Sequence, residues 1–176
     1  MVIHSYGLSA MLSLLLNREV SMSLQLLNYL HILGAVLLVG NILVSAWWKI
    51  MANRTKDATI ISFAQRQVTL TDYVFTLPGA ILIVIAGDMM AFVLFEDTWE
   101  ITWVSLGRIV FGITGFIWLF ILIPTQIRQA ELAREFTKTG SIPESYWKLS
   151  QRWNFFGTIA VILPLIVLAV MIWKPI

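Results

Sequence analysis

His31 is the residue of this sequence with the most informative chemistry. It lies inside an uncharged run from Leu24 to Trp48, and a helix of about 25 residues spans roughly 37 Å, enough to cross a hydrocarbon layer of about 30 Å. An imidazole inside a membrane span is costly unless it has a partner, so it is a functional-site hypothesis by default. In a helical bundle it can ligate haem iron through one ring nitrogen while a hydrogen bond holds the other. Haem ligation is therefore one candidate role of His31, and a proton relay through His31, Asp88 and water is another.

Four further functional side chains are predicted at a similar depth, in the outer half of the membrane: Asp88, Met89, Met90 and Arg108. A methionine thioether could be the sixth iron ligand, and the arginine fork suits a porphyrin propionate. Together with His31 they form the predicted cofactor-binding site, in which no residue is singled out as catalytic. The structural alternative is a buried Asp88–Arg108 ion pair that fixes helix register, with His31 bonded to one of the two or to a carbonyl and the methionines only packing.

The composition places the chain in a bilayer. Hydrophobic residues make up 59% and charged residues 12%, whereas soluble domains carry about 25% charged residues. The chain has no cysteine, which excludes disulfides, thiolate metal sites and cysteine nucleophiles. The net charge of +2 does not indicate nucleic acid, because the basic residues concentrate in two loops.

Hydropathy predicts an amino-terminal extension or interfacial segment at residues 1–21 and a transmembrane domain at 22–176. The four predicted spans are about 24–48, 73–95, 101–123 and 154–173. The third span is expected to continue past residue 123 as an amphipathic helix. Because the first and third loops carry most of the Lys and Arg, they are predicted to be cytoplasmic and both termini non-cytoplasmic. We expect a multi-pass protein of a bacterial inner membrane.

Small residues cluster on one face of each of the first three spans. Examples are Gly34, Gly79, Gly112 and Gly115. Helices in lipid associate by close packing, so the pattern predicts an all-α, antiparallel four-helix bundle in which these faces meet.

A second polar layer is expected at the inner boundary of the membrane. It contains Asp72, Arg152 and Asn154. We interpret Asp72 and Arg152 as a boundary ion pair.

Several short motifs resemble a known family. They are Leu30–Gly34 in the first span, Phe75–Gly79 in the second, Trp103 with Arg108 in the third, and Arg152–Asn154 in the fourth. They resemble a widespread family of small predicted integral membrane proteins of unknown function, which is similar in turn to the HemJ-type protoporphyrinogen oxidase, a membrane haem protein. The resemblance covers about residues 24–175.

The HemJ-type resemblance implies that His31 is a haem b ligand. That family also uses a lysine in the third span, where this chain has Arg108. A guanidinium stays protonated and cannot ligate iron. The resemblance therefore supports the fold and haem more than it supports protoporphyrinogen oxidation, and Arg108 is assigned to a propionate or charge partner.

We predict a haem-binding membrane protein with redox work on a tetrapyrrole or quinol, and leave open whether it is an enzyme. Its expected partners are the lipid bilayer and a quinone or redox protein, with homo-oligomers left open and nucleic acid excluded. The alternative is a cofactor-free membrane scaffold or assembly protein that meets its partner through residues 126–136. A small transporter is the third and least favoured interpretation, because no discontinuous helix pairs or repeats are evident.

Overall fold

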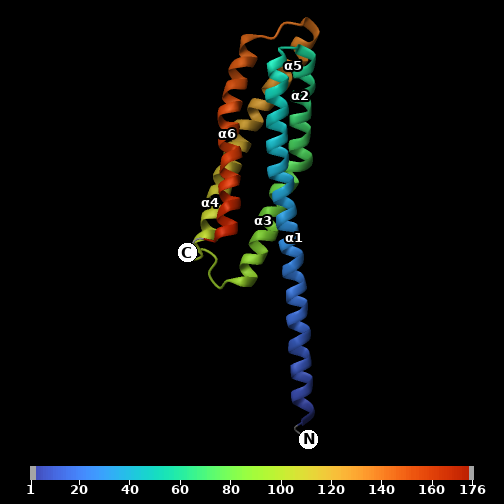
Figure 1. Ribbon diagram of the computed structural model, residues 1–176, viewed down its shortest axis with the longest axis vertical. Coiled ribbons are helices and arrows are strands. Elements are labelled where there is room, and N and C mark those ends of the chain that lie inside the picture. The colour runs from blue at the N-terminus through green and yellow to red at the C-terminus, as the bar shows by residue number, and fades with distance from the viewer. Residues whose placement is uncertain (1–2, 175–176) are drawn as a thin grey trace.

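The computed structural model describes the backbone of residues 3–174 and the side chains of residues 18–174. The described residues are mostly helical and contain no strand. The helices are α1 (Ile3–Thr55), α2 (Ala58–Thr71), α3 (Leu77–Leu94), α4 (Thr102–Ile117), α5 (Ile123–Thr139) and α6 (Glu144–Trp173). Two π-helical segments, η1 (Asp72–Thr76) and η2 (Trp118–Leu122), join α2 to α3 and α4 to α5 without a break. The chain therefore forms four long helices that run up and down (Figure 1).

Each of the four long helices is long and apolar enough to cross a membrane. They cover residues 18–55, 58–94, 102–139 and 144–173. The predicted all-α, four-helix membrane protein is thus confirmed. At about 1.5 Å per residue, a helix of 37 residues runs roughly 56 Å, well beyond a hydrocarbon layer of about 30 Å, so several turns of the longer helices extend outside it.

We name the two ends of the molecule by their charge. The acidic end is the connection at 95–101, which carries Glu96, Asp97 and Glu100. The basic end contains the turn at 56–57 and the connection at 140–143, near the basic side chains of α1, α5 and α6. The amino-terminal part of α1 extends past the acidic ends of α3 and α4 as one helix (Figure 1). Residues 1 and 2 of the predicted extension lie outside the described residues.

The basic end is held by a small core of its own. Buried side chains of α1, α2, α5 and α6 form it: Ala52, Ile61, Ala133, Phe136 and Tyr146. The first loop of the sequence analysis is therefore largely the helix α2, which begins at an Asp57 cap that accepts hydrogen bonds from the amides of Thr59 and Ile60. The expected continuation of the third span as a helix is confirmed by α5.

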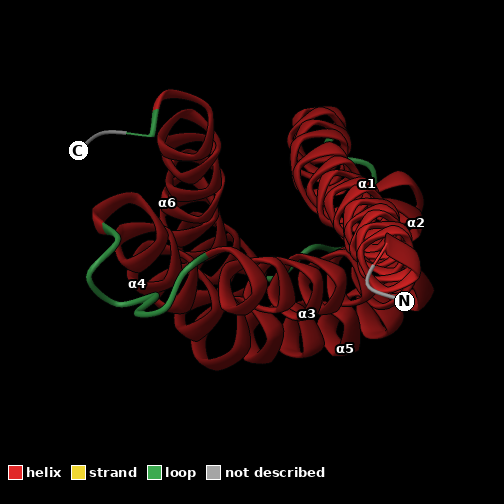
Figure 2. Ribbon diagram, turned by 90° about the horizontal axis from the view of Figure 1, so that it is seen from below, coloured by secondary structure: helices red, strands yellow, loops and turns green. Residues whose placement is uncertain are grey.

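The helices pack as two pairs, α1 with α3 and α4 with α6. Seen from below, they form an open arc (Figure 2), and α1 contacts α6 near the basic end, where Asn53 donates to Ser150 Oγ at 2.8 Å. Gly34 and Gly79 explain the closeness of the first pair: a Cβ on Gly34 would lie 2.7 Å from the Gly79 carbonyl oxygen, and a Cβ on Gly79 would lie 2.8 Å from that of Gly34. The predicted close packing of small residues is confirmed here.

The third span differs from its prediction. A Cβ on Gly112 or Gly115 would meet no heavy atom within 4 Å, so the expectation that these two glycines make close helix contacts is wrong. Gly107 is the glycine of α4 that faces a neighbour, Met171 of α6. The difference arises because the arc leaves open space beside α4, where Gly115 lines a cavity.

Candidate functional site

His31 lies between α1 and α3 with one ring nitrogen fixed. Its Nδ1 is 2.9 Å from the carbonyl oxygen of Ile83, and because a carbonyl can only accept, Nδ1 carries the hydrogen. The ring rests on Gly87, where a Cβ would come within 2.8 Å of the imidazole Cε1. Among the described residues no protein atom forms a hydrogen bond with Nε2, which is left as the nitrogen that can ligate or accept a proton.

Arg108 and Asp88 form an ion pair, as the structural interpretation predicts. Arg108 Nε donates to Asp88 Oδ1 at 2.9 Å, and Nη2 lies 2.8 Å from the same oxygen. Nη1 donates to Thr98 Oγ1 at 2.9 Å, and the guanidinium stacks on the ring of Trp99. The pair is only partly buried, since the Asp88 side chain is 41% exposed.

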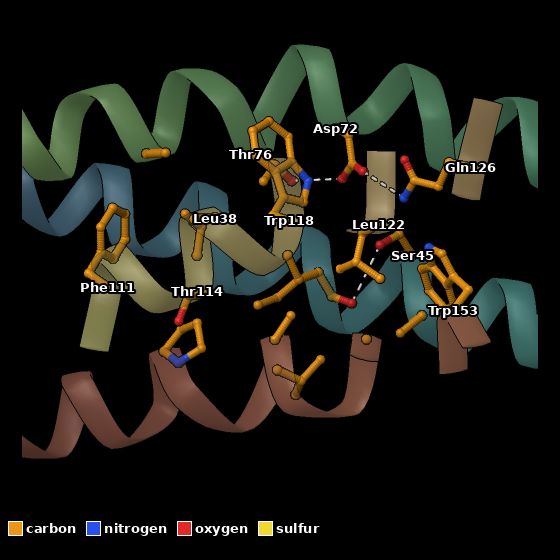
Figure 3. Close-up of a pocket in the computed structure, with 18 residues that line it drawn as sticks. Leu38, Ser45, Asp72, Thr76, Phe111, Thr114, Trp118, Leu122, Gln126 and Trp153 are labelled. Atoms are coloured by element: carbon orange, nitrogen blue, oxygen red, sulfur yellow. Dashed lines mark hydrogen bonds between the residues drawn. The ribbon is translucent and has the colours of Figure 1, made fainter. Parts of the chain in front are cut away.

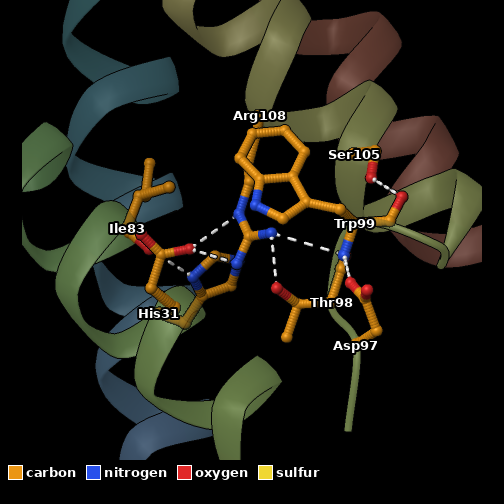
Figure 4. A network of polar contacts seen from close by, with 8 residues as sticks. His31, Ile83, Asp97, Thr98, Trp99, Ser105 and Arg108 are labelled. Atoms are coloured by element: carbon orange, nitrogen blue, oxygen red, sulfur yellow. Dashed lines mark hydrogen bonds and ion pairs between the residues drawn. The ribbon is translucent and has the colours of Figure 1, made fainter. Parts of the chain in front are cut away.

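The structure brings some of the predicted site residues together and separates others. His31 and Arg108 appear in one close-up with the acidic-end connection beside them (Figure 4). Met89 is 51% exposed on the outer surface, which makes it a poor candidate for an axial ligand, whereas Met90 is half-buried. The guanidinium of Arg108 is already held by Asp88 and Thr98, so a propionate would have to compete for it.

A cleft opens between the two helix pairs, on the basic-end side of His31. Its cavity volume is about 80 Å³, and it is partly open to the surroundings. Leu38 on α1 and Gly115 on α4 line it. Leu38 lies two helical turns, about 10 Å, after His31 on the same face of α1. Gly115 lies two turns after Arg108 on the same face of α4. The predicted haem layer thus lies on the same helix faces as the cleft, nearer the acidic end.

A buried carboxylate, Asp72, lies at the basic-end side of the cleft (Figure 3). Only 6% of it is exposed. Its Oδ1 accepts hydrogen bonds from Asn41 Nδ2 at 3.2 Å and Thr76 Oγ1 at 2.9 Å, and its Oδ2 accepts from Gln126 Nε2 at 2.9 Å. The predicted pair with Arg152 is wrong, because neutral donors satisfy the carboxylate and Arg152 is exposed on α6.

Lys49 is the functional group that the sequence analysis missed. Only 1% of it is exposed, and its ammonium group donates to Gln65 Oε1 and, at 2.7 Å, to Gln129 Oε1. It also lies 4.5 Å from the ring centroid of Trp153. Lys49 lies at the start of the first loop, whose basic residues the sequence analysis uses only to predict topology. The glutamines within otherwise apolar helix faces were the signal that could have indicated a buried partner.

Asp72 and Lys49 belong to one chain of hydrogen bonds. Gln126 donates to Asp72 through its side chain and accepts at its backbone carbonyl from Gln65 Nε2 at 3.3 Å. Gln65 in turn accepts from Lys49. Two opposite charges are therefore buried together, connected by carboxamides from α2 and α5 and not by direct contact.

Both π-helical segments precede a proline. η1 ends two residues before Pro78 and η2 ends two residues before Pro124. A proline lacks the N–H that would bond the carbonyl four residues earlier, and its ring crowds that carbonyl. A π-helical turn accommodates this defect, and such turns are frequent at functional sites. Here they present Asp72, Thr76 and Trp118 to the cleft.

The described residues contain no group of three or more His, Asp or Glu placed to hold a bare metal ion.

The chain belongs to the family described as predicted integral membrane protein (DUF2269), whose family model matches residues 25–175. The resemblance to small integral membrane proteins of unknown function is thereby confirmed. No curated protein and no solved structure matches the chain, so its similarity to the HemJ-type oxidase stays a prediction.

Proposed function

We propose that this integral membrane protein binds one b-type haem through Nε2 of His31, in a bacterial inner membrane. The observation that carries the proposal is the hydrogen bond from His31 Nδ1 to the Ile83 carbonyl at 2.9 Å. Ligating histidines commonly donate their second ring N–H to a carbonyl or carboxylate, which fixes the tautomer and raises the basicity of the ligating nitrogen. Bound haem supplies one-electron chemistry, which suits electron transfer or oxidation of a tetrapyrrole or quinol.

The neighbouring residues have defined tasks in this proposal. Gly87 leaves room for the imidazole, because any side chain there would collide with the ring. Arg108 acts as a charge partner at the acidic end while it stays bonded to Asp88. Of the two methionines, Met90 would be the better placed to help hold the haem, because Met89 is exposed.

An optical spectrum of the purified chain tests the proposal. The protein is produced with added haem precursor and purified in detergent, and spectra are recorded before and after dithionite. We expect a Soret band, reduced α and β bands, and about one haem per chain by pyridine haemochrome. His31→Ala should lose the pigment and keep its helical circular dichroism. Tyr29→Ala, on the 61% exposed surface of the same helix, should keep both.

Two results refute the proposal. One is a colourless wild-type protein under these conditions, and the other is full haem occupancy in His31→Ala.

The alternative function, a cofactor-free scaffold, draws on the exposed face of α5. Gln129, Ala133 and Phe136 of this helix are buried, whereas Arg128 and Glu131 face outward and pair with each other at 2.7 Å. This function predicts a colourless protein that co-purifies with a stoichiometric partner, and loss of that partner when the exposed charges of α5 are reversed.

A further inference from the structure

We propose that the cleft between the two helix pairs binds the head group of a lipid-soluble quinone, a flat, uncharged ring with carbonyl oxygens. The cleft is distinct from the His31 layer, and the proposal does not rest on haem. Three properties of the lining residues select this class of ligand.

The first property is an excess of hydrogen-bond donors. Trp153 is only 6% exposed, and its indole Nε1 has no hydrogen-bond partner among the described residues. Trp118 points its indole N–H towards the Asp72 carboxylate (Figure 3), so Trp153 is the tryptophan of the cleft whose N–H has no partner among the described residues. Both tryptophans line the cleft. Buried indole N–H groups normally find a partner, so the cleft suits a ligand that accepts hydrogen bonds.

The second property is the balance of charge. The Asp72 carboxylate accepts hydrogen bonds at both of its oxygens, and Lys49 lies in the same buried network. The two charges are opposite, so the site offers no net charge to an ion. A phosphate head group would meet the Asp72 carboxylate, which accepts hydrogen bonds and donates none. An uncharged acceptor is therefore favoured over a phospholipid.

The third property is the shape and access of the cleft. Its cavity volume is about 80 Å³, several times the roughly 10–15 Å³ that one water needs on the same measure, so it has room for a single small ring. Phe111, Trp118 and Trp153 supply aromatic walls, and Pro164 and Ala160 supply small apolar ones. The cleft lies among membrane-spanning segments of α1, α4 and α6. The ligand must then enter from lipid, as a quinone with an apolar tail can.

Two glycines of α4 provide a matched pair of variants. Neither Gly112 nor Gly115 has a heavy atom within 4 Å of its Cβ position, so leucine can be introduced at either without a collision of its first atom. Gly115 lines the cleft, whereas Gly112 is exposed. Gly115→Leu fills the proposed site, and Gly112→Leu makes the same change on the same helix outside it.

The experiment measures binding of a short-chain ubiquinone to the full chain in detergent by equilibrium dialysis. We expect saturable binding near one quinone per chain, weakened about tenfold or more by Gly115→Leu and less than about twofold by Gly112→Leu. Trp153→Phe keeps the ring and removes the N–H, and should weaken binding by up to about tenfold. Trp173→Phe, at an 80% exposed position, should leave binding unchanged. Circular dichroism checks that each variant is folded.

Competition identifies the ligand class. Decylbenzene, which has a ring and a tail but no oxygen, should not displace the quinone. Displacement by decylbenzene or by phospholipid at equal concentration, or wild-type binding by Gly115→Leu, would overturn the proposal. The haem proposal is tested separately by the optical spectrum, and quinone binding to the wild-type chain is measured whether or not the protein is coloured.

Discussion

The contact between Gly34 and Gly79 makes a sharp prediction about the packing of α1 on α3. We consider Gly34→Ala, which adds a single methyl group where the two backbones touch. That Cβ would lie 2.7 Å from the Gly79 carbonyl oxygen, 2.9 Å from the Ile83 amide nitrogen and 2.9 Å from the Leu82 Cβ. Two of these three neighbours are backbone atoms, which cannot move independently of the helix.

The required displacement follows from these distances. Ordinary contact begins at 3.4 Å, so α3 must retreat by 3.4 − 2.7 = 0.7 Å at Gly79 and by 3.4 − 2.9 = 0.5 Å at Ile83. A gap of about 0.5–1 Å forfeits a quarter to a half of each neighbouring dispersion contact. Overpacking of this kind costs about 1–3 kcal/mol. At about 2–4 °C per kcal/mol for a chain of this size, the midpoint of thermal unfolding should fall by several degrees.

The control is Gly40→Ala, on the same helix, where no heavy atom lies within 4 Å of the Cβ position. Both changes gain the same helix propensity, up to about 1 kcal/mol, so their difference isolates the packing cost. The assay is thermal unfolding in one detergent, followed by circular dichroism. The double variant Gly34→Ala with Gly79→Ala should lose less than the sum of the single variants, because the first displacement makes room for the second. Equal midpoints for Gly34→Ala and Gly40→Ala would refute the reasoning.

The remaining predictions concern the buried charge and the orientation of the chain. Lys49→Met should lower the free energy of unfolding by about 3–5 kcal/mol, because Gln65 and Gln129 lose their hydrogen-bond donor and the buried Asp72 carboxylate loses its countercharge. Denaturant unfolding measures this change. A decrease below about 1 kcal/mol would contradict the buried network. Because the chain has no cysteine, single cysteines report topology: the positive-inside rule predicts that Glu96→Cys reacts with a membrane-impermeant maleimide in intact cells and that Ser141→Cys reacts only after permeabilisation. The reverse pattern contradicts the predicted orientation.

The helices were predictable from the sequence because each membrane-spanning segment is a long apolar run. The hydrogen-bond and packing partners of individual side chains were less predictable. The Asp88–Arg108 pair was predictable, because the two residues have opposite charges and lie at the same depth. The partner of His31 was not, because His31 bonds the backbone carbonyl of Ile83, and every residue has a backbone carbonyl. Gly34 was correctly placed on a packing face, whereas Gly112 was not, since a small-residue pattern alone does not say which face of a helix meets a neighbour.

Lys49 shows why the basic end was the hardest part to predict. A lysine at the end of an apolar run normally extends its ammonium group to the interface, and the charge count is the same whether it does so or folds inward. The choice depends on whether acceptors wait inside, here Gln65 and Gln129, which come from two other helices. Only the tertiary arrangement brings those three residues together.

The placement of the buried charges gives the cleft its chemical character. Asp72 belongs to η1, whose π-helical geometry accompanies Pro78, and Lys49 reaches it only through the carboxamides of Gln65 and Gln126. If Lys49 and Asp72 were in direct contact, they would form an ion pair and neither would need the glutamines as partners. Because amides separate them, the carboxylate stays at the margin of the cleft while its countercharge stays behind it. The cleft therefore carries polar groups in an otherwise apolar, membrane-level space without presenting a net charge, a combination that favours uncharged amphiphiles over ions.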